Sequence, residues 1–142
     1  MYIAIDFDGT IVTHEYPYIG RDLPYVKEVI KTLVDNGHKL FLYTMRDGDQ
    51  LEDAIKYCEF NNLNFIGYNK SPQQFSTSPK QYASVYIDDA ALGCPVIFDP
   101  TVSDRPYVNW SAVAKWCADR MLITYEQYYS IKEIQTIIKK DH

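Results

Sequence analysis

Residues 1–10 read MYIAIDFDGT, an apolar run that ends in two carboxylates followed by a glycine and a hydroxyl. The apolar part has the composition of a buried β-strand, and acids that follow such a strand come to the sheet edge where open α/β proteins bind their ligands. Asp6 and Asp8 repel each other unless a cation lies between them or one of them is protonated. The stretch therefore predicts an α/β protein with a reactive site at the end of its first strand.

The bulk properties favour one domain that spans residues 1–142, with a core over 1–100 and a helical tail over 110–140. The formal net charge of -5 disfavours binding through nucleic-acid phosphates. It does not exclude a local basic groove. No run approaches the roughly 20 apolar residues of a membrane-spanning helix. The N-terminus also lacks the basic and apolar regions of a signal peptide. We therefore expect a cytoplasmic protein with no membrane partner.

The three cysteines, Cys58, Cys94 and Cys117, are widely spaced along the chain. No CxxC pair and no histidine spacing accompanies them, so the pattern favours neither a disulfide framework nor a zinc site. We expect them to be reduced residues that pack in the interior.

Strands and helices alternate over the first hundred residues. Apolar runs predict strands at 2–7, 39–44, 65–68, 84–87 and 95–98. Helical spacing predicts one helix from about Asp22, as its cap, to Gly37, and a second with Asp49 and Glu52 at capping-box spacing. Because parallel strands need crossover connections, this order predicts a five-stranded parallel sheet with helices on both faces.

The tail departs from this alternation. Residues 110–121 and 125–140 have the pattern of two consecutive helices, the second with Thr124 and Gln127 at capping-box spacing. The aromatic residues of the tail fit a core or packing surface better than a binding platform, and an exposed cluster of them would favour a homo-oligomer.

Polar side chains gather at the ends of the predicted strands. They are Asp6 and Asp8 after the first strand, Thr44 at the end of the second, Lys80 before the fourth, and Asp88 and Asp89 after it. Since the carboxyl ends of parallel strands lie along one edge, we expect these groups to share a crevice. The set suits phosphoryl transfer, because one carboxylate can attack phosphorus while a divalent cation, the lysine and the hydroxyl hold the phosphate oxygens.

This ordered set resembles the haloacid dehalogenase-like (HAD) hydrolase superfamily, most of whose members are magnesium-dependent phosphatases that act through an aspartyl-phosphate. The first motif of that family, DxDGT, is similar to residues 6–10, and the second, a strand that ends in Thr or Ser, to residues 42–44. The third, a lysine, and the fourth, a strand that ends in acids, fit Lys80 and residues 87–89. The resemblance covers about residues 1–100 and implies a HAD-like Rossmannoid three-layer fold.

The resemblance also implies roles for the four acids. Asp6 would be the nucleophile and a ligand of Mg²⁺. Asp8 would be the general acid and then the general base, with its backbone carbonyl on the metal. Asp89 would be a direct metal ligand, and Asp88 would support the metal or pair with the lysine.

The remaining motif residues would hold phosphate. Thr44 would bind a phosphate oxygen, and Lys80 would pair with both Asp6 and the phosphate, with Lys70 as a weaker candidate for that lysine. Arg46 resembles the Thr-x-Arg continuation of several of these hydrolases and is a candidate for a further phosphate or carboxylate contact.

Residues 12–21, called the flap below, occupy the place of the family's small flap. The flap tyrosines, His14 and Arg21 are candidates to stack on or clamp a substrate, and packing of the loop against the domain is an equal alternative. Gly9 and Thr10 complete the candidate substrate contacts. We find no room for a sizeable cap domain between Asp8 and Thr44, or between Thr44 and Lys80.

The sequence therefore predicts a capless Mg²⁺-dependent phosphomonoester hydrolase that acts on a phosphorylated substrate of unknown identity. An open cleft suits phosphoproteins or nucleic-acid ends, or small substrates covered by a partner subunit, and a small nucleotide fits as well. The alternatives are a receiver-like phosphoacceptor, whose acids and lysine come in a different chain order, and a non-catalytic phosphate or metal-binding protein. A calcium loop fits poorly, because its twelfth position holds a Glu where this chain has Pro17.

Overall fold

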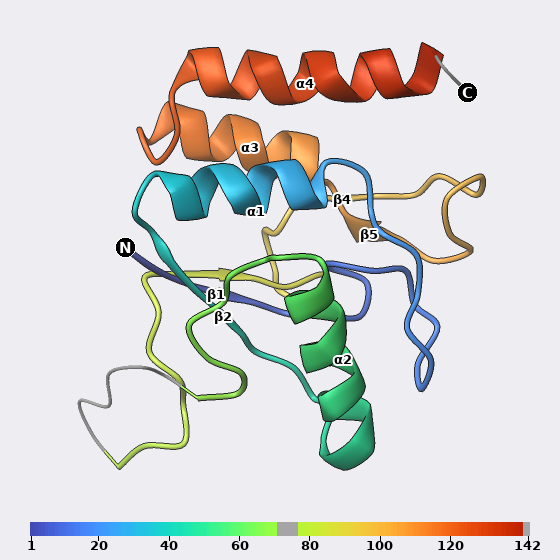
Figure 1. Cartoon of the computed structure of the whole chain (residues 1–142), viewed down its shortest axis with the longest axis vertical. Coiled ribbons are helices and arrows are strands. Elements are labelled where there is room, and N and C mark those ends of the chain that lie inside the picture. The colour runs from blue at the N-terminus through green and yellow to red at the C-terminus, as the bar shows by residue number, and fades with distance from the viewer. Residues whose placement is uncertain (71–76, 141–142) are drawn as a thin grey trace.

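The structure is a computed structural model that describes residues 1–70 and 77–140, with side chains described as far as residue 134. Strands and helices alternate through the first part of the chain and two helices end it, which confirms the α/β class (Figure 1). In chain order the elements are β1 (Tyr2–Ile5), α1 (Val26–Asp35), β2 (Lys39–Leu42), α2 (Gly48–Phe60), β3 (Val85–Ile87), β4 (Val96–Ile97), β5 (Tyr107–Val108), α3 (Trp110–Asp119) and α4 (Tyr125–Lys140).

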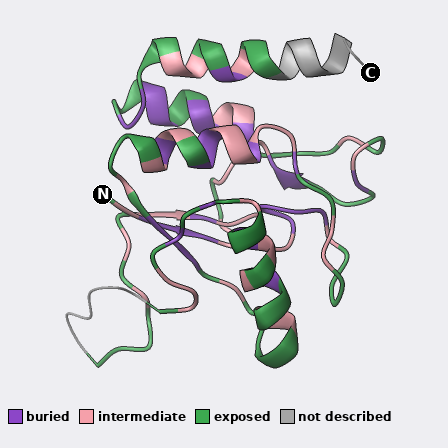
Figure 2. Cartoon of the chain, in the orientation of Figure 1, coloured by how far each residue is buried: buried purple, intermediate pink, exposed green. Residues whose placement is uncertain are grey.

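The central strand β1 is parallel to both of its neighbours, in the order β2-β1-β3. Ile5 is in register with Leu42 on one side and with Ile87 on the other, so the three strands end level with one another. Helices α1, α3 and α4 are stacked on one side of this sheet and α2 lies on the other (Figure 1). The apolar residues of β1 and β2 are buried between these layers, as expected for parallel strands covered on both faces (Figure 2).

The described sheet is narrower than the five parallel strands that the sequence predicts. Residues 65–68 run beside β2, where the N–H of Leu42 donates to the Gly67 carbonyl at 2.9 Å, but they form only an isolated parallel bridge between Leu42 and Tyr68. The prediction of a fifth parallel strand at 95–98 is wrong, because β4 in that segment pairs antiparallel with β5 in a separate sheet. The partner lies a short loop away, so this pairing needs no crossover and little loop-closure entropy.

The first two helices begin without the side-chain caps that the sequence predicts. The residue before α1 is Tyr25, with φ of 71°, and Asp22 instead pairs with Lys27, Oδ2 to Nζ, at 2.7 Å. The residue before α2 is Asp47, which makes no side-chain cap. The helices themselves lie close to their predicted positions, because their apolar faces rather than their caps determine where they pack.

The two tail helices pack against α1 and extend its core. Trp110 at the start of α3 is 1% exposed. Ile123 in the turn before α4 and Ile131 in α4 itself are also buried. Thr124 and Gln127 form the predicted capping box, with reciprocal backbone-to-side-chain bonds of 2.9 and 3.0 Å. No helix in the described part of the chain is long and apolar enough to cross a membrane.

The three cysteines are free, and two of them, Cys58 and Cys117, are buried. Burial raises the pKa of the Cys58 thiol to about 12 and that of the Cys117 thiol to about 11. Both side chains therefore stay protonated at neutral pH and pack as small apolar groups, as the sequence predicts.

Candidate functional site

The site lies where β1 and β3 end side by side. Asp6 directly follows β1, and its N–H donates to the carbonyl of Ile87, the last residue of β3, at 2.9 Å. This bond continues the strand pairing one residue further and brings Asp6 beside the acids that follow β3. As a result, carboxylate oxygens of Asp6, Asp88 and Asp89 lie within 4.8 Å of one another, and all three residues are half-buried. These three residues are called the acid cluster below.

Thr10 connects two members of the acid cluster. Its side chain is fully buried, and its Oγ1 lies 3.2 Å from Asp6 Oδ2 and 3.4 Å from Asp89 Oδ1. The same hydroxyl oxygen accepts the backbone N–H of Asp89 at 3.2 Å. Because a hydroxyl carries one proton, Thr10 donates to one carboxylate at a time. Its oxygen stays bonded to the Asp89 N–H, so Thr10 links Asp89 to Asp6.

Gly9 leaves the space that His14 occupies. Its φ is +77°, and a Cβ added there would lie 2.0 Å from His14 Nε2. That nitrogen lies 3.0 Å from Asp89 Oδ2, with both side chains largely shielded from solvent. The flap residue His14 therefore contacts the acid cluster itself. The sequence had proposed His14 only as a candidate substrate contact.

Three ionised carboxylates this close together repel one another, so the acid cluster is unfavourable when all three are charged and no cation is bound. Burial first, and then the charges of Asp88 and Asp89, raise the pKa of Asp6 to about 8. A bound cation acts in the opposite direction, because it favours the ionised form of each carboxylate. Carboxylate oxygens are the ligands that hard divalent cations such as Mg²⁺ and Ca²⁺ take in proteins, so the residues fit a cation of this class.

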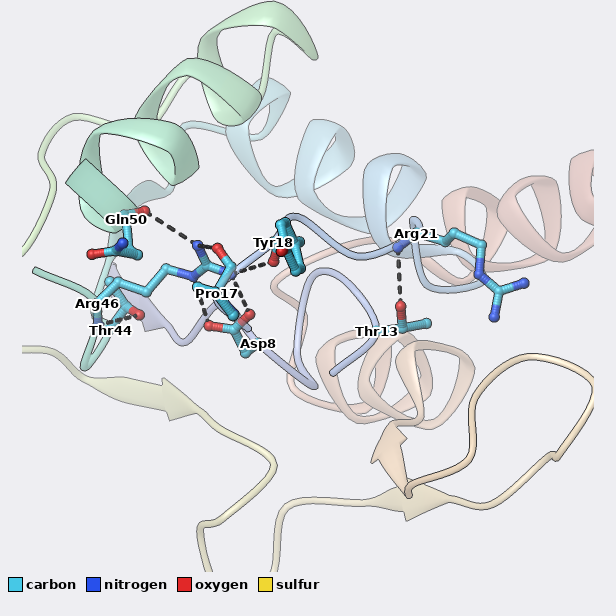
Figure 3. A network of polar contacts seen from close by, with 8 residues as sticks. All are labelled: Asp8, Thr13, Pro17, Tyr18, Arg21, Thr44, Arg46 and Gln50. Atoms are coloured by element: carbon cyan, nitrogen blue, oxygen red, sulfur yellow. Dashed lines mark hydrogen bonds and ion pairs between the residues drawn. The ribbon is translucent and has the colours of Figure 1, made fainter. Parts of the chain in front are cut away.

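The carboxylate of Asp8 is held by Arg46 (Figure 3). Arg46 Nε and Nη2 donate to the two carboxylate oxygens at 2.8 and 2.7 Å, and the arginine is 2% exposed. The remaining guanidinium N–H groups donate to the carbonyls of Pro17, Tyr18 and Gln50 at 2.7 to 3.2 Å. Since an arginine has five N–H donors, all of them are used inside the protein. Of the phosphate or carboxylate contact that the sequence proposed, Arg46 makes a carboxylate contact, to Asp8, and in this structure it has no N–H left for a phosphate.

Thr44 lies in a turn that Asn69 holds in place. The N–H of Thr44 donates to Asn69 Oδ1 at 2.8 Å, and Asn69 Nδ2 donates to the Arg46 carbonyl at 3.3 Å. Thr44 Oγ1 accepts the N–H of Arg46 at 3.1 Å. Asn69 was not among the predicted site residues, although an Asn at the end of an apolar run is a signal for the left-handed backbone, and its φ is 55°.

Lys80 lies outside the acid cluster. It is exposed, its Nζ lies 5.4 Å from the centre of the Tyr86 ring, and among the described residues it forms no ion pair with Asp6. Lys70, the weaker candidate, is also exposed. The lysine contact implied by the resemblance is thus not formed in this structure.

Arg21 holds the base of the flap rather than the site. Its guanidinium donates to the Val102 carbonyl, and its backbone exchanges bonds with Thr13 at 2.9 and 3.0 Å. Its side chain points away from Asp8 and Arg46 (Figure 3). Val102 lies outside the flap, so we assign Arg21 to packing of the flap against the domain, which was the alternative interpretation of this residue.

The tail supports residues 6–10, called the acid loop below, from inside the molecule. The buried indole of Trp110 donates to the Thr10 carbonyl at 2.5 Å, a bond between residues a hundred positions apart. The N–H of Val108 donates to the Gly9 carbonyl at 3.0 Å. The sequence predicts a packing role for the tail aromatics, Trp110 among them, but not this bond, because its acceptor is a backbone carbonyl, which every residue carries.

The fold and site define an α/β protein with an acid cluster at the carboxyl edge of a parallel sheet. The chain is similar to a conserved protein from Bacteroides thetaiotaomicron, with a TM-score of 0.68 and 33% identity over 91% of this chain and 97% of that chain. The chain belongs to the family of that conserved protein. No protein-family model and no curated protein matches the chain.

Proposed function

We propose that the protein is a Mg²⁺-dependent phosphomonoester hydrolase of the HAD type. The proposal is carried by one observation: carboxylates of Asp6, Asp88 and Asp89 lie within 4.8 Å of one another where two adjacent parallel strands end. Asp8, two residues after Asp6, supplies a further carboxylate on the same loop. The order and spacing of these acids agree with the resemblance to HAD hydrolases.

The chemistry assigned to the chain begins with Asp6. Its carboxylate oxygen would attack phosphorus while the bond from phosphorus to the leaving oxygen breaks, and Asp8 would protonate that oxygen. Asp8 would then take a proton from the water that hydrolyses the aspartyl-phosphate. Thr10 would keep Asp6 oriented, and Thr44 would bind a phosphate oxygen.

The cation would be held by Asp6, Asp89 and the backbone carbonyl of Asp8, with Asp88 in support. When bound, Mg²⁺ supplies positive charge that offsets the charges of the phosphate and the carboxylates. Such an ion also favours ionised Asp6, which is the form that attacks. The raised pKa of Asp6 is therefore consistent with a nucleophile that depends on its cation.

The position of Lys80 favours a second candidate. Its Nζ lies over Tyr86 rather than beside Asp6, so phosphate binding by this lysine requires the side chain to move. A non-catalytic metal-binding protein would use the same acids without that movement. A receiver-like phosphoacceptor that does not turn over also uses a lysine, so the position of Lys80 does not favour it.

The test is a panel of phosphomonoesters assayed for inorganic phosphate with Mg²⁺ and with EDTA. We expect multiple turnovers with Mg²⁺, none with EDTA, and a loss of at least about 10³-fold in Asp6→Asn, the size found when a nucleophile is removed. Asp104→Asn, at an exposed acid in the loop between β4 and β5 and outside the acid cluster, is the matched control and should keep full activity. A single equivalent of protein-bound phosphate would instead support the phosphoacceptor, and Mg²⁺ binding without any phosphate release would support the non-catalytic protein.

A further inference from the structure

We infer that Arg46 is a positioning residue that holds Asp8 in its reactive orientation and couples it to the flap. The inference rests on the proposed function, since the orientation of Asp8 matters only where a leaving oxygen is protonated. It replaces the direct substrate contact that the sequence suggested for Arg46.

The pair of Asp8 and Arg46 is built as a rigid unit. Two parallel bonds of 2.7 and 2.8 Å join the guanidinium to the carboxylate, and the arginine side chain is 1% exposed. A bidentate pair of this kind fixes the plane of the carboxylate as well as its position. A carboxylate has about four lone-pair sites, so the two bonds to Arg46 leave others free to face a leaving oxygen or a water.

The other three guanidinium bonds connect this pair to its surroundings. Carbonyls of Pro17 and Tyr18 in the flap and of Gln50 in α2 accept them (Figure 3). The guanidinium carbon also lies 5.2 Å from the centre of the Tyr16 ring, so a further flap residue packs on the arginine. Arg46 therefore makes all of its bonds, and holds Asp8 fully, only when the flap lies in this position.

Two features separate this role from the alternatives. A direct phosphate contact needs a free N–H, and Arg46 uses all five on the protein. A merely structural arginine would affect every substrate equally. A residue that positions the general acid affects most the substrates whose leaving oxygen needs a proton.

The experiment compares Arg46→Lys with wild type on an alkyl phosphate and on p-nitrophenyl phosphate, through kcat/KM. This parameter covers the steps up to departure of the leaving group, and p-nitrophenolate departs without a proton. Lysine presents one ammonium in place of the planar fork, so it cannot keep both bonds to Asp8. We expect about a 10²-fold loss on the alkyl phosphate and less than about a 10-fold loss on the aryl phosphate, the scale of a misplaced general acid.

Three further variants complete the design. Asp8→Asn should show the same selective loss, and Asp8→Asn combined with Arg46→Lys should lose no more than Asp8→Asn alone, because Arg46 acts through Asp8. Arg120→Lys, at the end of α3 with its guanidinium over the Trp116 ring, is the matched arginine control and should leave both substrates unchanged. Equal losses on both substrates, or additive losses in the double variant, would overturn the inference. Absence of turnover by wild type on every ester would instead reject the proposed function.

A measurement without substrate covers the case in which Arg46→Lys does not fold. In wild type the Arg46 Nε–H should exchange slowly with solvent in NMR spectra, because it is buried and bonded to Asp8, and Asp8→Asn should speed this exchange at least about tenfold. An Arg46 Nε–H that exchanges at the same rate in both proteins contradicts the coupling, whatever the activity.

Discussion

Residue 9 must be a glycine for both its backbone conformation and the space that His14 occupies. We expect Gly9→Ala to destabilise the protein for two reasons, the left-handed φ of +77° and a Cβ 2.0 Å from His14 Nε2. Gly37→Ala is the matched control, since its φ is +88° and the Cβ would meet nothing within 4 Å. The control should cost about 1–2 kcal/mol of unfolding free energy in urea, and Gly9→Ala about 1–3 kcal/mol more. Equal losses would mean that His14 moves aside freely.

Asp6 gives the stability of the protein a defined dependence on pH. Its pKa of about 8 in the folded protein is above the 3.8 of an unperturbed carboxyl, so between these values the folded state binds a proton that the unfolded chain has released. The contribution of Asp6 to stability is therefore present in full below pH of about 4 and is lost as the pH rises to about 8.

The measurement compares wild type with Asp6→Asn by urea unfolding in EDTA at several pH values. Wild type should lose stability relative to the variant as the pH rises, because the amide that replaces the carboxyl has no proton to release. Addition of Mg²⁺ should reverse the trend for wild type near pH of about 8, where a cation replaces the proton. Parallel curves for the two proteins in EDTA would show that Asp6 titrates normally.

The site residues differ in how far the sequence could predict them. Three of the acids, Asp6, Asp88 and Asp89, follow apolar strands. Because the carboxyl ends of parallel strands lie along one sheet edge, their positions were enough to predict that they meet. The network of Arg46 was not predictable, because three of its five acceptors are backbone carbonyls, which every residue carries.

Among the helices, α3 bonds directly to the loop that carries Thr10. Trp110→Phe removes the indole that donates to the Thr10 carbonyl and leaves that buried acceptor without its partner. We expect it to lower the unfolding free energy by about 2–3 kcal/mol. Trp116→Phe on the same helix is the control, and at 36% exposure it should cost less than about 1 kcal/mol. Similar effects of the two substitutions in urea unfolding would contradict the anchoring role of Trp110.

The elements also show what local patterns can and cannot predict. The capping box of Thr124 and Gln127 was predicted correctly, because both of its bonds join residues three positions apart. The segment at 95–98 was predicted as a strand but assigned to the wrong sheet, since its apolar run does not reveal which partner it has. Its pairing with β5 depends on a neighbour that no pattern within 95–98 specifies.

At the scale of the whole molecule, a cation bound at the acid cluster would join the first strand to the third. Asp6 and Asp89 follow different strands, so binding should stabilise the native state and not a local segment. Mg²⁺ at about 100 times its Kd should add about 2.7 kcal/mol to the unfolding free energy, seen as a rise in Tm. Asp89→Asn should abolish most of the rise, whereas Asp104→Asn should keep it. A rise of equal size in both variants would place the cation elsewhere.

The bond between Trp110 and Thr10 also bears on how the protein is made. During synthesis the acid loop leaves the ribosome first and α3 follows much later, so the nascent chain carries Asp6 and Asp8 long before the indole that anchors their loop exists. A chain interrupted before Trp110 would hold every acid of the cluster and still lack that anchor. The chemistry proposed for the first ten residues is therefore expected to begin only once the last third of the chain has emerged and docked.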